Sequence, residues 1–515
     1  MKSLDTLLEP AFPADAPGAA IGVVIDGEVR YVKGFGLANL NTRVSFTADT
    51  QFRACSVSKQ FVCLLVRQLE REGLLALDAH PSKYVPALAM FPETLTVRHL
   101  CQNRSGLHDY WCVAMLTGAK LDSCFTLKEG AELIRRLHQP MFPPGAQYSY
   151  NNGNWRILEW IVGAVTSRPL SDLLAERIFG PLGMAHSGWG SDTSLALPGN
   201  PKGYRRLDNG WEEEVTRACW SGDAALTTTM SDYLRWELAM LKADTTRLPC
   251  ADMLAQAMPH PDGERGSYAF GMNAWQQGER WMHWHSGALR GWRMVQMRFP
   301  QDGIAIVVML NRTENPMPIA MKIAECVGVK TTWDEVVPLP LALNPNIAGV
   351  YYSSELDLLV ETRQESGDVG ISLGGDYMPL LQTGEHTWAN ASGFCRVEFD
   401  GGQLAIHERQ FGWHSKFASL PDSDDRAAMG GMEFHSDLLR STISFTNDGA
   451  TLSIRGPAGQ SDIYPVRPLG RNMIAFDCLR ALDETPPGRF TIHISEDRRK
   501  IIVGCFMARG LEFVR

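Results

Sequence analysis

Apolar and polar positions alternate in some parts of the chain and recur at helical spacing in others. Residues 19–39 form two β-rich runs separated by Asp26-Gly27, a dipeptide that predicts a hairpin turn. After a turn-rich piece, a helix is expected from Ser56 to Gly73, where it ends as helices often do. The apolar positions of this helix are Phe61, Leu64, Leu65 and Leu69.

The rest of the first 330 residues mixes helices with strands. The pattern predicts helices at 126–138, 153–167, 169–178 and 230–242, and strands at 279–288, 292–300 and 303–311. Strands near both ends of the region surround a helical middle, so we predict one sheet with helices packed on it, an α+β domain over 1–330.

A proline-rich stretch at 331–345 is typical of a linker, and the character of the chain changes after it. Short alternating strands and Gly/Asp/Asn turns predict small antiparallel barrels over 346–422 and 423–515. The two parts open alike, with "GVYYSSELDLL" and "GMEFHSDLLRS", which favours two equivalent β-domains.

Composition narrows the functional classes. The chain of 515 residues is too long for one ordinary core, and its net charge of −9 argues against a nucleic-acid partner. No run approaches the roughly 20 apolar residues of a membrane span, and we expect no signal peptide. The 11 scattered cysteines, without C-x-x-C, favour reduced thiols in a cytoplasm and no zinc site.

"CSVSKQF" (55–61) places Ser56 three residues before Lys59, so both lie on one face of the predicted helix. A lysine activates a serine if burial or a neighbouring cation lowers its pKa, and the helix N-terminus favours negative charge near Ser56. A helix cap beside a solvated lysine is the plainer interpretation, because S-x-x-K is common.

Two further motifs carry chemistry. Tyr150 and Asn152 form a Y-x-N triplet: the phenol suits proton transfer, and the amide suits holding Lys59 or a substrate carbonyl. Tyr148 is a rival to Tyr150 that lacks the Asn two residues on. His285-Ser-Gly287 lies on a predicted strand, where a glycine often marks close approach to a ligand.

The backbone N–H of Ala288, together with that of Ser56, is a candidate oxyanion hole. We interpret His283 as structural. No further group of metal-ligating residues accompanies His283 and His285 in the sequence, so no metal is predicted.

The order S-x-x-K, Y-x-N, H-x-G resembles the penicillin-recognising serine hydrolases, which include class C β-lactamases, D-Ala-D-Ala carboxypeptidases, esterases and D-aminopeptidases. Matching segments such as "LTVRHLCQNRSGLHDY", "PPGAQYSYNNGN" and "IFGPLGMAHSGW" extend the resemblance over residues 15 to 330. It implies a β-lactamase/transpeptidase-like fold, an antiparallel sheet flanked by helices. Ser56 becomes the acylated nucleophile, Lys59 and Tyr150 share the proton transfers, and Asn152 and His285 line the pocket.

The sequence departs in two places from the pattern of β-lactamases and carboxypeptidases, and these differences narrow the class of hydrolase that it resembles. His285 stands where many β-lactamases and carboxypeptidases have a lysine that holds a substrate carboxylate, and a histidine is only partly charged near neutral pH. The appended β half resembles bacterial D-aminopeptidases. That resemblance implies release of N-terminal D-amino acids with small side chains, such as D-Ala, D-Ser and D-Thr, from peptides, amides and esters through an acyl-enzyme, without a cofactor.

By the same resemblance, the last barrel sends a loop, 472–488, into the catalytic cleft, where a carboxylate recognises the substrate ammonium. Asp477 is preferred for this role over Asp483. Asn273 and Arg217 are further pocket candidates, and Arg217 near Lys59 would lower the pKa of that lysine.

The resemblance also implies a homodimer and inhibition by β-lactams. An esterase or a β-lactamase/D-Ala-D-Ala carboxypeptidase-like hydrolase with accessory barrels is the alternative function, and a non-enzymatic binder that retains the fold is a third. The preference for D-residues comes from the resemblance alone, because residue types do not reveal it.

Overall fold

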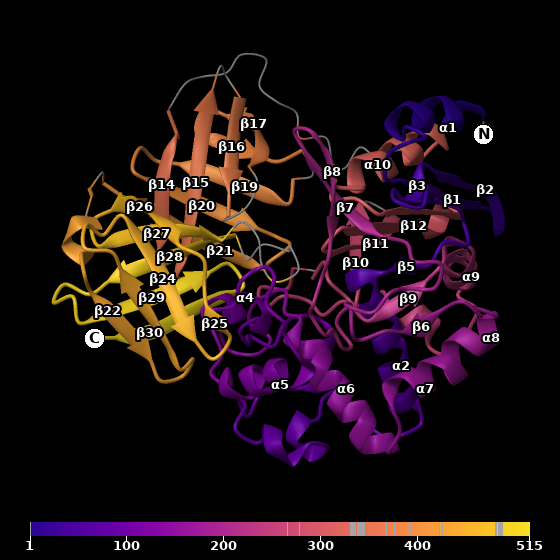
Figure 1. Cartoon of the computed structure of the whole chain (residues 1–515), viewed down its shortest axis with the longest axis horizontal. Coiled ribbons are helices and arrows are strands. Elements are labelled where there is room, and N and C mark those ends of the chain that lie inside the picture. Colours follow the sequence, from indigo (N-terminus) through magenta and orange to yellow (C-terminus); the bar gives the residue numbers. More distant parts are fainter. Residues whose placement is uncertain are drawn as a thin grey trace.

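The computed structural model places the first 330 residues on one side of the molecule and the β-rich remainder on the other (Figure 1). The structure describes residues 2–264, 266–277, 279–329, 336, 346–365, 368–373, 377–391, 393–421, 423–424, 426–478, 482 and 488–515.

A six-stranded antiparallel sheet forms the centre of the first region, with the strand order β10-β11-β12-β13-β1-β2. The first hairpin is the one predicted: Asp26 and Gly27 form its turn with φ of 51° and 75°, as a tight hairpin turn requires. The strands are β1 (Ala19–Ile25), β2 (Glu28–Phe35), β10 (Asn273–Gln277), β11 (Arg280–Leu289), β12 (Trp292–Phe299) and β13 (Ile304–Leu310).

Both faces of this sheet are covered, which explains the uninterrupted apolar sequence of β13. Ile306 and Val308 pack in a core with helices α1 (Lys2–Leu8) and α10 (Met317–Cys326). Val307 and Met309 point to the opposite face, where they join the core of the helical middle. Successive side chains of a strand point to opposite faces, so a central strand between two layers has no polar side.

The helical middle contains the predicted helices. The predicted helix after Ser56 begins as a 3-10 turn, Cys55–Ser58, that continues into α2 (Lys59–Arg71). The other helices are α3 (Val97–Cys101), α4 (Tyr110–Met115), α5 (Leu127–Arg136), α6 (Gly153–Thr166), α7 (Leu170–Leu174) with a π-helical turn (Ala175–Phe179), α8 (Gly180–Leu182) and α9 (Met230–Leu241).

Short strands connect these helices to the sheet and pair among themselves in three small sheets. They are β3 (Leu37–Asn39), β4 (Val44–Ser45), β5 (Phe52–Arg53), β6 (Gly188–Trp189), β7 (Gly203–Leu207), β8 (Gly210–Glu214) and β9 (Leu226–Thr228).

The β-rich half forms two antiparallel barrels, as predicted. The first is a closed barrel in which β14 pairs with β21. Its strands are β14 (Gly349–Ser353), β15 (Leu358–Glu365), β16 (Asp368–Ser372), β17 (Met378–Gly384), β18 (Thr387–Ala389), β19 (Cys395–Phe399), β20 (Gln403–Glu408) and β21 (Trp413–Ser419).

The second barrel closes through the pairing of β23 with β24. Its strands are β22 (Glu433–Ser436), β23 (Ser441–Phe445), β24 (Thr451–Gly456), β25 (Gly459–Gln460), β26 (Tyr464–Gly470), β27 (Met473–Cys478), β28 (Gly488–Ile494), β29 (Lys500–Cys505) and β30 (Ala508–Val514). The similar segments at 349 and 431 each begin the first hairpin of a barrel, β14–β15 and β22–β23.

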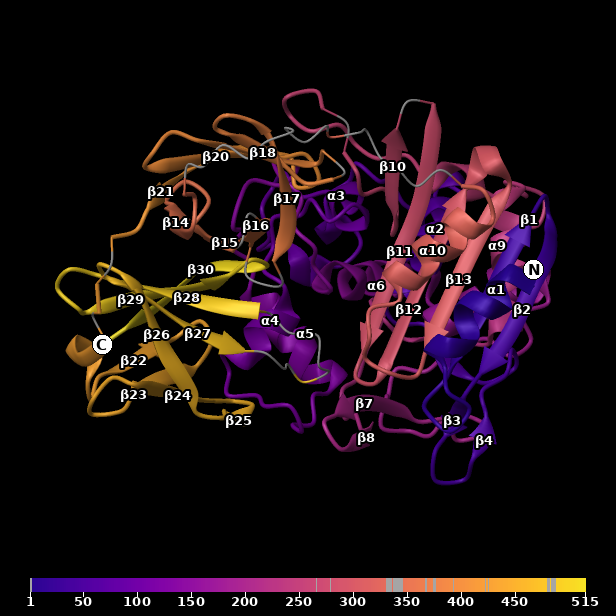
Figure 2. The same cartoon turned by 90° about the horizontal axis from the view of Figure 1, so that it is seen from above.

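The predicted linker 331–345 lies outside the described residues, apart from Val336. Among the helices that the structure describes, none combines the length and the apolar character needed to cross a membrane. Seen from above, the β28 and β30 ends of the second barrel point toward α4 of the helical middle (Figure 2).

A carboxylate is buried in the first barrel, at the end of β20. Glu408 accepts a hydrogen bond from the Gln410 N–H at 3.1 Å, and burial raises the pKa of its carboxyl to about 7. An acid whose pKa is higher in the folded state stabilises the fold below its unfolded pKa. As the pH rises from about 4.5 through about 7, this stabilisation is lost, and the free energy of unfolding falls by about 3 kcal/mol at most.

We therefore predict that Glu408→Gln, which keeps the acceptor oxygen but does not ionise, raises the melting temperature at pH 8.5 and leaves it nearly unchanged at pH 4.5. Calorimetry at both pH values measures the difference. An equal change in melting temperature at the two pH values would show that ionisation of Glu408 does not destabilise the fold.

Candidate active site

Ser56 lies in the 3-10 turn that precedes α2, next to strand β11. Cys55, the residue before it, has φ of 55°, a left-handed conformation that costs free energy for a residue other than glycine. Gly287 of β11 packs against this turn: a Cβ at that position would lie 2.7 Å from Cys55 Cβ and 2.8 Å from Ala54 O. The sequence predicted that this glycine allows close approach of a ligand; the close approach that the structure shows is to the turn that carries Ser56.

Lys59 follows one helical turn later and is fully buried beneath the serine. Its Nζ lies 3.1 Å from Ser56 Oγ, 3.1 Å from Asn152 Oδ1 and 2.6 Å from the Asp223 carbonyl oxygen. The rings of Tyr150 and Trp155 flank the amine, with centroids at 5.0 and 5.2 Å. The prediction that Ser56 and Lys59 meet, and that Asn152 holds Lys59, agrees with this geometry.

Burial lowers the pKa of Lys59 to about 8, because the low-dielectric interior disfavours the charged amine. Asn152 Oδ1 and the Asp223 carbonyl only accept hydrogen bonds. A neutral Lys59 donates its two protons to them, and its lone pair then faces the Ser56 hydroxyl. The arrangement can therefore activate a serine nucleophile.

Asp109 orients Asn152, a role that the sequence analysis did not assign. The Asp109 carboxylate accepts hydrogen bonds from Asn152 N at 2.6 Å and from Asn152 Nδ2 at 3.0 Å. Fixing the amide nitrogen in this way turns Asn152 Oδ1 toward Lys59. Burial raises the pKa of Asp109. The local sequence marks Asp109 only as the N-cap of α4.

Tyr150 stands over Ser56 from the loop that leads into α6. Burial raises the pKa of the Tyr150 phenol well above its ordinary value, so the phenol keeps its proton near neutral pH. It lies within hydrogen-bond reach of Ser56. Tyr150 is thus placed to donate a proton, and Lys59 is the better acceptor.

His285 is uncharged in this setting. Burial lowers its pKa to about 3. Its Nδ1 donates to the Ser286 carbonyl oxygen, so Nε2 accepts from the Tyr268 hydroxyl at 3.1 Å. The position that resembles a carboxylate-holding lysine therefore carries no positive charge.

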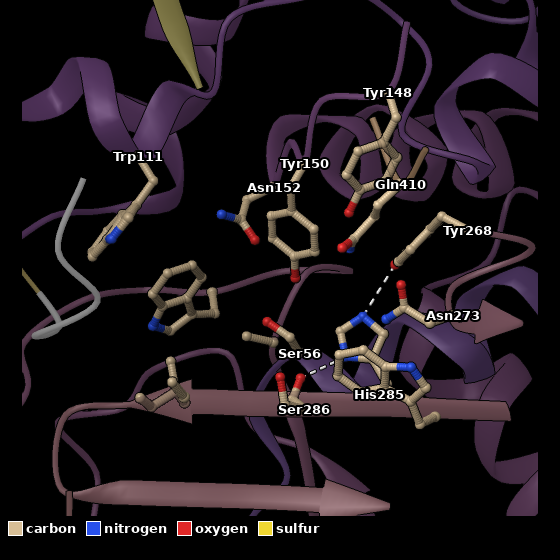
Figure 3. A pocket seen from close by; sticks show the side chains of 15 residues that line it. Ser56, Trp111, Tyr148, Tyr150, Asn152, Tyr268, Asn273, His285, Ser286 and Gln410 are labelled. Atoms are coloured by element: carbon tan, nitrogen blue, oxygen red, sulfur yellow. Dashed lines mark hydrogen bonds between the residues drawn. The ribbon is translucent and has the colours of Figure 1, made fainter. Parts of the chain in front are cut away.

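Ser56, Tyr150, Asn152 and His285 line one pocket of about 270 Å³ (Figure 3). Ser56 lies at its floor; Trp111 stands on one side, and Gln410, Tyr268, Asn273 and His285 stand on the other. The residues that line the pocket are Ser56, Trp111, Tyr148, Tyr150, Asn152, Trp220, Ala224, Tyr268, Asn273, Trp284, His285, Ser286, Ala288, Leu289 and Gln410.

The structure contradicts the prediction for Arg217. Its side chain is exposed and is not among those that line the pocket. The segment runs as an extended chain in which Ala218 and Trp220 point inward, so Arg217 points to solvent. Burial is the largest cause of the lowered pKa of Lys59.

Asp477 is also placed differently from the prediction. It lies on β27 opposite Arg489 of β28, and Arg489 Nε donates to its carboxylate at 2.6 Å. It does not line the pocket, because the strand continues through Asp477 and a cross-strand arginine pairs with its charge. Asp483 lies outside the described residues and stays a prediction.

Two parts of the pocket could not be predicted from the sequence: the aromatic wall and one residue of the first barrel. Trp111 and Trp220 pack with ring centroids 4.4 Å apart beside Ser56. Tyr268 holds His285, and Gln410 enters from the turn between β20 and β21. Helical spacing marks Trp111 only as apolar, and nothing local marks Gln410.

Comparison with known proteins gives two family matches. Residues 7–324 match the β-lactamase family model, and residues 341–514 match the model described as D-aminopeptidase, domain B. A curated D-aminopeptidase from Brucella anthropi is 30% identical over 516 residues, covering 97% of this chain and 95% of that protein.

Two solved structures share the fold. The octameric penicillin-binding protein homologue from Pyrococcus abyssi aligns with a TM-score of 0.57 at 20% identity, covering 81% of this chain and 99% of the other. A D-amino acid amidase from Ochrobactrum anthropi, solved with L-phenylalanine amide, aligns with a TM-score of 0.50 at 22% identity, covering 60% and 90%.

We predict that Gly287→Ala displaces β11 from the Ser56 turn, because the new methyl group meets backbone. It should lower stability by about 1–3 kcal/mol and slow labelling of Ser56 by a fluorophosphonate by about 100-fold. Thermal unfolding and labelling rates measure the two effects. Gly163→Ala is the matched control: its methyl group meets nothing within 4 Å, so labelling should be unchanged. If Gly287→Ala is labelled at the normal rate, the close packing of Gly287 against the Ser56 turn does not position the serine.

Proposed function

The chain belongs to the β-lactamase family, and from this premise we propose that it is a D-aminopeptidase that works through an acyl-enzyme on Ser56. The observation that carries the proposal is the 3.1 Å contact between Lys59 Nζ and Ser56 Oγ, together with the pocket that Ser56 and Tyr150 both line. The relatives named D-aminopeptidase align over 97% of the chain, both barrels included, which favours this activity over a simple esterase.

In acylation, Ser56 Oγ attacks the carbonyl carbon of the N-terminal D-residue while its proton passes to the neutral Lys59 amine. The backbone N–H groups of Ser56 and Ala288 are the candidate donors to the oxyanion. When the C–N bond breaks, Tyr150 donates its proton to the leaving amine and regains one from Lys59. Water then attacks the ester, with the same groups moving the protons in reverse.

The pocket favours small side chains on the acyl residue. Its volume is about 270 Å³, and Trp111 and Trp220 form one wall. Indole faces also attract an ammonium group through cation–π contacts, which suits a free N-terminus. We propose D-Ala, D-Ser and D-Thr as acyl residues for this reason.

Two expectations of the sequence analysis form part of the proposal. β-lactams are inhibitors that acylate Ser56, and the enzyme is a homodimer. Mass spectrometry of the intact protein after exposure to a β-lactam, and light scattering, measure these two properties.

The proposal predicts cleavage of D-Ala p-nitroanilide, but not of L-Ala p-nitroanilide or N-acetyl-D-Ala p-nitroanilide. Ser56→Ala should lower turnover by about 10⁴-fold or more while the protein keeps its melting temperature. Ser45→Ala, an exposed serine on β4, is the control and should retain activity. Cleavage of the N-acetyl substrate or fast nitrocefin turnover would favour the esterase or β-lactamase-like alternative. No acylation by any ester or β-lactam would favour a binder.

The lowered pKa of Lys59 predicts a pH dependence. The amine accepts the Ser56 proton only when neutral, so activation is absent well below its pKa and present above it. Fluorophosphonate labelling, which involves no substrate amine, should rise about tenfold per pH unit up to about pH 8 and then level off. Lys59→Arg, which stays charged, should abolish the rise. A rate independent of pH between 6.5 and 9 would exclude Lys59 as the base.

A further inference from the structure

The turn between β20 and β21 carries a side chain of the first barrel into the pocket of the catalytic region. Gln410 lies in this turn and lines the pocket beside Tyr148 and Tyr268 (Figure 3). More than a hundred residues separate it along the chain from every other residue of the pocket. The barrel therefore completes the site.

The catalytic region holds this turn in place on two sides. Tyr148 N–H donates to the Phe411 carbonyl at 3.0 Å, and Ser267 Oγ donates to the Gln410 carbonyl at 3.3 Å. Gly412 has φ of 67° and packs against His260, where a Cβ would lie 2.0 Å from the His260 ring nitrogen. The Gln410 side chain is thus presented from a fixed backbone.

Gln410 shares its side of the pocket with a second carboxamide, that of Asn273. The Asn273 Oδ1 atom is buried, and no hydrogen-bond partner for it exists in the part of the chain that the structure describes. A buried acceptor without a partner is costly, so this oxygen is suited to a donor that arrives with the substrate. Two carboxamides supply the donors and acceptors that match the N–H and C=O of a peptide group.

This side of the pocket carries no charge. None of the described residues that line the pocket is an aspartate, glutamate, lysine or arginine, and His285 is neutral. His285 stands where related hydrolases have a lysine for the carboxylate of the leaving residue, so this side faces the leaving group. The acyl residue then occupies the opposite side, against Trp111.

We propose that Gln410 and Asn273 form a subsite that binds the first peptide group beyond the scissile bond, and that it selects uncharged leaving groups. This inference rests on the proposed function. It gives the first barrel, through Gln410, a direct part in the specificity for the leaving group. The enzyme consequently prefers peptides that continue past the second residue, or end in an amide, over dipeptides with a free carboxylate.

The test compares kcat/KM for D-Ala-Gly-NH2, D-Ala-Gly and D-Ala methyl ester, whose leaving group is too short to reach Gln410. The wild type should favour the amide over the acid by at least about tenfold. Gln410→Ala should lower kcat/KM for D-Ala-Gly-NH2 about fivefold to tenfold more than for the methyl ester. Gln410→Lys, which adds a cation, should reverse the preference toward D-Ala-Gly.

Gln403→Ala replaces an exposed glutamine of β20, the strand that leads into the Gln410 turn; it is the matched control and should leave all three values unchanged. Asn273→Ala should repeat the selective loss, and melting temperatures establish that each variant folds. If Gln410→Ala lowers all three substrates equally, or none, the inference is wrong while the proposed function stands. A wild type that cleaves none of the three would overturn the proposed function and this inference together.

Discussion

The burial of one amine governs the arrangement of the catalytic region. Lys59 is fully enclosed, and the groups that receive its protons are neutral oxygens of Asn152 and Asp223. An ammonium removed from water is costly, and the attraction of the Asp223 and Asp109 carboxylates offsets this cost only in part, so the amine gives up its proton more easily than an exposed lysine does. To enclose it, the chain brings together α2, the start of α6 and the loop before β9. In the proposed mechanism, this desolvation is what makes the serine reactive.

The second barrel supports the same site through backbone contacts. Asp109 N–H donates to the Met507 carbonyl at 3.0 Å, and the Asp109 carboxylate holds Asn152. His108 contacts the Arg509 carbonyl at 2.7 Å. The turn between β29 and β30 thus braces the residue that orients the partner of Lys59. The ring of Phe506 in this turn packs at a tilt against that of Phe411 in the first barrel, with centroids 4.8 Å apart, so both barrels meet beside the pocket.

Local patterns in the sequence were sufficient for most of the fold. Asp26-Gly27 identified the first hairpin, apolar spacing identified α2, and period-two alternation with frequent turns identified the barrels. These features depend on neighbours within a few residues, where propensity and periodicity act directly. The same holds for Ser56 and Lys59, because a helix places residues three apart on one face whatever surrounds it.

The tertiary structure alone decided which distant residues join that pair. Arg217 and Asp477 are charged residues of plausible type, yet one points to solvent and the other pairs across two strands with Arg489. Gln410 sits in an unremarkable turn, and only the docking of the first barrel onto Tyr148 and His260 carries it to the serine. The sequence by itself determined the helical turn that brings Lys59 to Ser56 and the barrels that follow. Packing between segments hundreds of residues apart decided the pocket walls, because side-chain direction there depends on contacts that no local pattern encodes.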